Sequence, residues 1–132
     1  MEVKITTENA RVPVTVVHVD GNIDSGSYEQ FLAAVQNAVD GGARHVLIDL
    51  SHVPFVSSAG LRAFNILLTR LRTLTPDVSE EEMLKGINDG TYKSPHLKLL
   101  SPSKATEATL ESSGFDMFID VLHDMKAALA AF

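Results

Sequence analysis

The sequence predicts an α/β fold in which a mixed β-sheet packs against helices, and three observations lead to this prediction. Short β-branched runs alternate along the chain with segments whose apolar residues recur at helical spacing. Residues 46–50 form an almost uninterrupted apolar run, which is typical of a strand covered on both faces. A length of 132 residues with 45% hydrophobic composition suits a globular domain with its own core. We therefore expect a single domain spanning residues 1–132.

The first half of the chain predicts two strands, a helix and a third strand. Residues 3–6 alternate apolar and polar side chains, residues 14–19 are almost all β-branched, and the turn-forming residues 9–13 join them into a hairpin. Asp24 or Ser27 is expected to cap the helix that follows, and a glycine pair is expected to end it before the strand at 46–50. The apolar stripe of this helix consists of Tyr28, Phe31, Leu32, Val35 and Val39.

The second half predicts helix, strand, helix, strand and helix in succession. An apolar stripe from Leu61 to Leu71 marks the first of these helices, which ends before a Thr-Pro pair. Residues 97–100 and 118–121 are the expected strands, and the helix between them begins at a Ser-Pro-Ser turn and ends at Gly114. An alanine-rich helix then closes the chain. The full order predicts a mixed sheet of about five strands with four helices packed against it.

Residues 75–95 do not fit this alternation, because about 2–6 residues is the usual length of such a connection. The segment carries its own helix start, in which Ser79 and Glu82 form a capping box. An apolar side would be supplied by Met83, Leu84 and Ile87. We expect an inserted helix on the surface of the domain.

Composition excludes several classes of function. A formal net charge of −6 opposes direct nucleic-acid binding, which needs a basic footprint. The chain has no cysteine, so disulfides, thiol catalysis and Cys-ligated zinc are excluded. No apolar run reaches the length needed for membrane insertion, and no signal peptide is visible at the start. The simplest expected location is the cytoplasm.

The most informative segment is residues 49–62, where a buried strand ends and Ser57 and Ser58 stand at the start of the next helix. A serine at a helix start is ordinarily a cap, because its hydroxyl accepts a hydrogen bond from a free amide. The same place also favours an anionic group, since the free amides and the helix dipole point toward it. A phosphate added there would bring about −1.5 to −2 charges to the surface.

This segment resembles the signature of STAS domains, the family of bacterial anti-sigma factor antagonists. The resemblance rests on Asp-Leu-Ser at 49–51, Phe55, and Ser-Ser-Ala-Gly-Leu at 57–61. Gly-Asn-Ile-Asp at 21–24 is similar to the family's motif before its first helix. The family's later landmarks are matched by Ser-Pro-Ser at 101–103 and Ser-Gly-Phe at 113–115, so the likeness covers nearly the whole chain.

The resemblance implies a protein-binding switch without a cofactor. Ser58 aligns with the serine that a partner anti-sigma factor, itself a serine protein kinase, phosphorylates, and the neighbouring Ser57 is the alternative acceptor. The unphosphorylated protein would bind the anti-sigma factor and free the sigma factor, whereas the phosphorylated protein would let go. A serine phosphatase fits the same scheme as a further partner. The inserted segment at 75–95 is longer than compact members of the family have.

A contact surface for this partner follows from the predicted topology. Two helices that leave the same side of one sheet can start close together, so residues from both starts are expected to share a surface. The expected surface consists of Asp24, Ser25, Phe55, Ser57, Ser58, Gly60, Leu61 and Arg62. Gly60 would permit close approach of a partner backbone. Leu61 also fits the apolar stripe of its helix, which favours a core position.

Other functions fit the sequence to different degrees. A hydrolase would show Gly-x-Ser-x-Gly, whereas Ser58 lies between Ser57 and Ala59, so an enzyme is not expected. The histidines form no pair at helical ligand spacing, which gives no zinc site; His18 and His45 are expected to be strand residues with satisfied ring nitrogens. Two binding functions remain as alternatives: a STAS scaffold or accessory subunit of a signalling or transport complex that is not switched, and a small-anion-binding domain at the same helix start.

Overall fold

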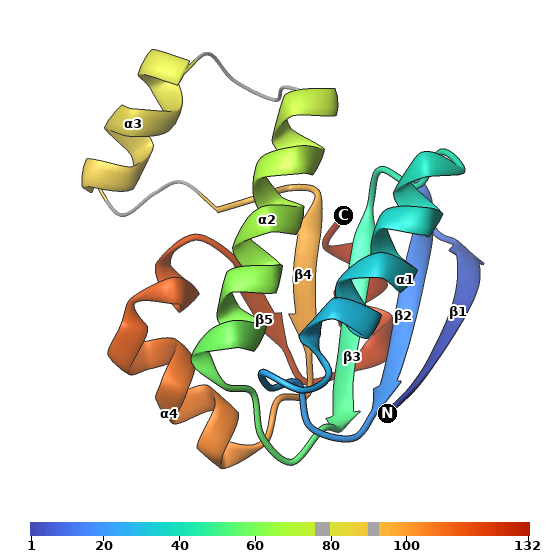
Figure 1. Ribbon diagram of the computed structural model, residues 1–132. Coiled ribbons are helices and arrows are strands. Elements are labelled where there is room, and N and C mark those ends of the chain that lie inside the picture. Colours follow the sequence, from blue (N-terminus) through green and yellow to red (C-terminus); the bar gives the residue numbers. More distant parts are fainter. Residues whose placement is uncertain (76–79, 90–92) are drawn as a thin grey trace.

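The computed structural model describes residues 1–75, 80–89 and 93–132, and its centre is a five-stranded sheet in the order β1-β2-β3-β4-β5 (Figure 1). The strands are β1 (Glu2–Asn9), β2 (Pro13–Asp20), β3 (Val46–His52), β4 (Leu97–Leu100) and β5 (Asp120–Leu122). β1 pairs with β2 in the antiparallel direction, and β2, β3, β4 and β5 pair in parallel. The predicted N-terminal hairpin and the mixed sheet are therefore confirmed.

Helices cover both faces of the sheet (Figure 1). One face carries α1 (Tyr28–Asp40), α2 (Ser58–Leu74) and α4 (Lys104–Ser113), whose apolar side chains share one core with β2, β3 and β4. At the centre of this core the rings of Phe31 and Phe64 meet edge to face, with their centroids 5.7 Å apart. The opposite face carries α5 (Met125–Ala130), where Ala128 packs against Val16 and Leu47.

The helix α3 (Glu80–Asp89) lies between α2 and β4 along the chain, which confirms an inserted helix (Figure 1). Met83 lines a hollow together with Leu68 and Phe118, so its side chain faces the body of the domain. Leu84 points away and is 52% exposed. Ser79 of the expected capping box and the side chain of Ile87 lie outside the described residues.

The observed elements differ from the expected ones at two boundaries. Gly114 adopts a left-handed φ of 76° and ends α4 as expected, but a short 3₁₀ turn, η1 (Phe115–Met117), follows it and shifts the last strand to 120–122.

The start of α1 also differs from the prediction. Ser27 precedes α1 without capping it through its side chain, because its hydroxyl donates to the carbonyl oxygen of Asn22 at 2.7 Å. The Asp24 carboxylate accepts from the Gly26 amide at 3.0 Å, which also lies before the helix. The predicted side-chain cap of α1 was therefore wrong.

Candidate protein-interaction site

The loops that follow β2 and β3 are joined by backbone hydrogen bonds at the carboxyl end of the sheet. The amide of Ile23 donates to the carbonyl of Phe55 at 3.1 Å, and the amide of Ser57 donates to the carbonyl of Ile23 at 2.9 Å. Ile23 and Val56 form an isolated parallel bridge. The starts of α1 and α2 are thus brought side by side, as the topology predicted (Figure 1).

Gly60 makes this close approach of the two loops possible. A Cβ atom at residue 60 would lie 2.5 Å from Val56 Cγ1 and 2.8 Å from the carbonyl oxygen of Ile23. Gly60 is buried, so the tight approach that requires glycine is to the chain's own backbone rather than to the backbone of a partner. Because Gly60 is buried, the expectation that it lets a partner backbone approach closely is corrected.

The two serines at the start of α2 occupy different environments. Ser58 is exposed, and no described residue forms a hydrogen bond with its hydroxyl. The Oγ atom of Ser57 is buried without a hydrogen-bond partner, and it does not cap the helix. Ser58 is therefore the hydroxyl of this pair that another protein can reach.

The remaining residues of the expected surface divide into exposed and packed groups. Ser25 and Arg62 are exposed, and Phe55 is 44% exposed. Leu61 is half-buried against the main core, as its place in the apolar stripe indicated. Asp24 is half-buried, and its carboxylate accepts from Ser27 Oγ at 3.1 Å. The exposed members of the expected surface are therefore Ser25, Phe55, Ser58 and Arg62.

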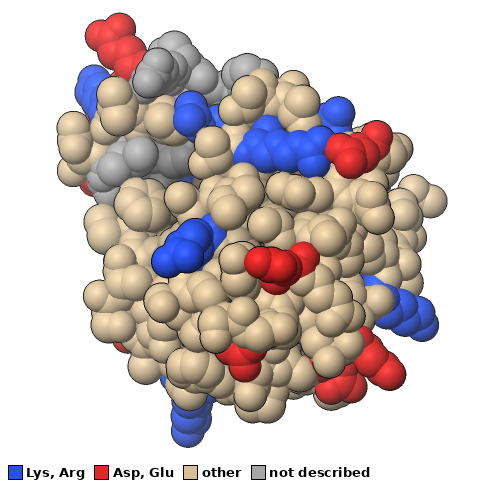
Figure 2. All heavy atoms as spheres, in the orientation of Figure 1, with Lys and Arg blue, Asp and Glu red and all other residues tan. Residues whose placement is uncertain are grey.

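The charge around the start of α2 favours an added anion. The first turn of α2 contains no acidic residue, and Arg62 lies one turn beyond Ser58. The first amides of a helix have no intrahelical acceptor, and the dipole places partial positive charge there. On the face seen in Figure 2, basic and acidic side chains are scattered with a broad uncharged area between them. One phosphate would change the potential of such a surface strongly.

A second polar group lies on the sheet face opposite α1 and α2, and the sequence did not indicate it. His18 and Asp49 are register partners on β2 and β3, and His18 Nδ1 lies 3.0 Å from Asp49 Oδ2. Thr6 Oγ1 lies 3.1 Å from His18 Nε2, so both ring nitrogens of His18 are satisfied, as expected. Burial alone would raise the pKa of Asp49, but hydrogen bonds from Ser51 and His18 together hold it below its ordinary value.

Two further histidines, His52 and His45, contact residues other than Ser58. His52 Nδ1 lies 3.2 Å from the hydroxyl of Ser51, its neighbour on β3. His45 was expected to be a strand residue, but it immediately precedes β3, and its ring packs against those of His96 and Phe132. Within residues 1–75, 80–89 and 93–132, no group of three histidine or carboxylate side chains is placed to hold a metal ion. No helix in the same residues is long and apolar enough to span a membrane.

The fold and the site define a class of small α/β protein that presents an accessible serine at a helix start and an exposed aromatic side chain in the loop before it. Residues 4–76, more than half of the chain, match the STAS domain family, and the chain belongs to that family. The predicted family resemblance is thereby confirmed.

Individual relatives agree with this assignment. A Bordetella bronchiseptica protein named as a candidate anti-sigma factor antagonist, BtrV, is 29% identical over 114 residues, which span 86% of this chain and 82% of the relative. A solved structure of a candidate anti-sigma factor antagonist from Thermotoga maritima superimposes with a TM-score of 0.72, covering 96% of this chain and 90% of that one at 14% identity. The phosphorylated form of SpoIIAA, a Bacillus cell fate determinant, superimposes with a TM-score of 0.61, covering 96% of both chains at 16% identity. These superpositions confirm the STAS-like fold.

Proposed function

We propose that this protein is an anti-sigma factor antagonist whose binding to an anti-sigma factor is switched off by phosphorylation of Ser58. The observation that carries the proposal is the contrast between the accessible hydroxyl of Ser58 and the buried hydroxyl of Ser57. The names of BtrV and of the solved structures support the general role. The kinase partner and the switch are supported by the position of Ser58 in the family signature.

The physical basis of the switch is electrostatic rather than conformational. The unmodified surface offers Phe55 as an apolar anchor and, three residues further along the chain, the uncharged hydroxyl of Ser58. A phosphate on Ser58 would be held by the first-turn amides of α2 and by its dipole, so the fold would tolerate it. A partner that has buried this surface would then face an unpaired double charge, which is costly to desolvate. The phosphorylated protein would therefore stay folded but would no longer bind its partner.

The direct test is phosphate mapping with matched serine variants. Wild type, Ser58→Ala and Ser57→Ala are incubated with the candidate anti-sigma factor kinases of the source organism and ATP, and the products are analysed by mass spectrometry. We expect one phosphate on wild type and on Ser57→Ala, and none on Ser58→Ala. Modification of Ser57, or of neither serine with every kinase tried, would reject the switch. Stable binding without modification would then favour a fixed scaffold, and retention of inorganic phosphate would favour an anion-binding domain.

A further inference from the structure

The loop that presents Phe55 and Ser58 is held on its two sides by different kinds of bond. On one side, backbone hydrogen bonds from Gly21 to His52, from Ile23 to Phe55 and from Ser57 to Ile23 tie it to the loop after β2. On the other side, Ser103 Oγ donates to the carbonyl oxygen of Pro54 at 2.8 Å. Among the described residues this is the only hydrogen bond that links the loop to the start of α4.

Ser103 is well placed to act as a fixed point for this loop. Its Oγ accepts from the amide of Thr106 at 3.1 Å, so it is also the side-chain cap of α4. Thr106 is fully buried and lies 3.0 Å from Ser103 through its own hydroxyl. The chain enters this turn through Ser101, whose φ of 52° is rare for a residue other than glycine. Such a backbone conformation persists only where the surroundings impose it.

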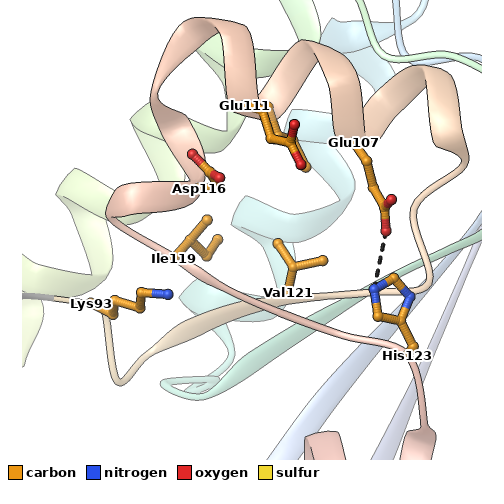
Figure 3. A pocket seen from close by; sticks show the side chains of 8 residues that line it. Lys93, Glu107, Glu111, Asp116, Ile119, Val121 and His123 are labelled. Atoms are coloured by element: carbon orange, nitrogen blue, oxygen red, sulfur yellow. Dashed lines mark ion pairs between the residues drawn. The ribbon is translucent and has the colours of Figure 1, made fainter.

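Side chains of α4 contact other parts of the domain, and Figure 3 shows one such contact, between Glu107 and His123. Glu107 Oε1 forms an ion pair with His123 Nε2 at 3.0 Å across a hollow that Ile119 and Val121 help to line (Figure 3). Leu110 packs in the main core from the same helix. Ser103 therefore reaches the loop from the start of a helix that packs on the main core.

We infer that Ser103 is a positioning residue that fixes where Phe55 and Ser58 are presented to a partner, and this inference rests on the proposed function. Ser103 acts through the Pro54 carbonyl and forms no hydrogen bond with Phe55 or Ser58. It also lies outside residues 4–76, where the family match falls, so the contact is contributed by the C-terminal part of this chain. Loss of the donated hydrogen bond should let the loop open more often from the β2–α1 side, so that the hydrogen bond from Ser57 to Ile23 breaks more frequently.

Three substitutions of Ser103 separate its hydrogen bond to Pro54 from its role as the cap of α4. Ser103→Asp keeps an oxygen that caps α4 but has no hydrogen to donate to Pro54. Ser103→Ala removes both bonds, and Ser103→Thr retains both and serves as the rescue. In the purified full chain, hydrogen exchange of the Ser57 amide reports on the loop, and exchange of the Thr106 amide reports on the cap.

We expect the Ser57 amide to exchange about three- to tenfold faster in Ser103→Asp and Ser103→Ala than in wild type, the factor that corresponds to one hydrogen bond. Thr106 should stay protected in Ser103→Asp, and Ser103→Thr should match wild type at both amides. Unchanged exchange at Ser57 in Ser103→Asp would overturn the inference, as would equal acceleration throughout the domain. Because no kinase is needed, these outcomes are independent of whether Ser58 is phosphorylated. Where the kinase binds wild type, Ser103→Asp should bind about threefold or more weakly, and equal affinity would also overturn the role in presentation.

Discussion

The two ends of the parallel strands are stabilised in different ways. At the carboxyl end, the loops after β2 and β3 satisfy each other's backbone groups and leave Phe55 and Ser58 free at the surface. At the amino end, His45 and His96 immediately precede β3 and β4, and their rings pack 5.7 Å apart, with Phe132 against His45. Both ring nitrogens of His96 are buried without a hydrogen-bond partner.

Stability and partner binding depend on different ends of the sheet in this domain. Backbone bonds hold the carboxyl end, so its side chains are free to contact a partner. At the amino end, side chains are used to close the structure: Lys98 is buried, pairs with Asp120 at 2.8 Å, and lies over the Phe132 ring. Changes to the exposed side chains at the carboxyl end should alter binding. Changes to packed residues at either end should alter stability, and at the amino end they should also alter its pH dependence.

Gly60→Ala should give the largest loss of stability at the carboxyl end. The new Cβ would meet Val56 and the Ile23 carbonyl at distances that real structures do not tolerate, so the two loops must separate. We expect unfolding free energy to fall by about 1–3 kcal/mol in denaturant titration. Gly41→Ala is the matched control, because φ is −80° there and a Cβ would make ordinary contacts. Equal stability of the two variants would show that the loops are not tightly joined.

His96→Leu should raise stability at the amino end by about 1 kcal/mol, because it removes a buried polar ring that makes no hydrogen bond. His123→Leu is the control, since His123 is on the surface and should change stability by less than about 0.5 kcal/mol. Thermal and urea unfolding measure both. If the His96→Leu variant were less stable than wild type, the ring nitrogens of His96 would have to form hydrogen bonds in solution.

The smallest expected effect is a pH dependence of stability that arises from His45. Burial, followed by the nearby His96 and Lys98, lowers the pKa of His45 in the folded protein below its ordinary value of 6.5. The folded state then binds fewer protons than the unfolded state, so this contribution to stability is present above pH 6.5 and is lost as pH falls from there through the folded pKa. Urea unfolding at about pH 7.5 and about pH 5 should show a smaller decrease in His45→Gln than in wild type. An identical decrease would exclude His45 as the cause.

The sequence predicted the strands, the main helices and the position of Ser58, because each depends on local periodicity or on a short motif. The 3₁₀ turn after Gly114 and the shifted last strand were missed, since one apolar run fits several boundaries. The contact from Ser103 to Pro54 joins residues far apart in the chain, and no spacing rule anticipates it. No spacing rule anticipates the contact between His45 and His96 either. The pairing of His18 with Asp49 follows from the register of β2 and β3, and the bulge between His18 and Asp20 makes this register difficult to derive from the sequence.

Under the proposed function, the charge at Ser58 controls binding to the anti-sigma factor without altering the fold. Calorimetric titration of the anti-sigma factor with wild type, Ser58→Ala and Ser58→Asp, accompanied by thermal unfolding of each, tests it most directly. We expect Ser58→Ala to bind like wild type and Ser58→Asp to bind more than about tenfold more weakly, because the charge must be desolvated at the interface. Unfolding temperatures of Ser58→Asp and wild type should agree, since the charge lies at a helix start that favours it. Equal affinity of Ser58→Asp and wild type would contradict the account.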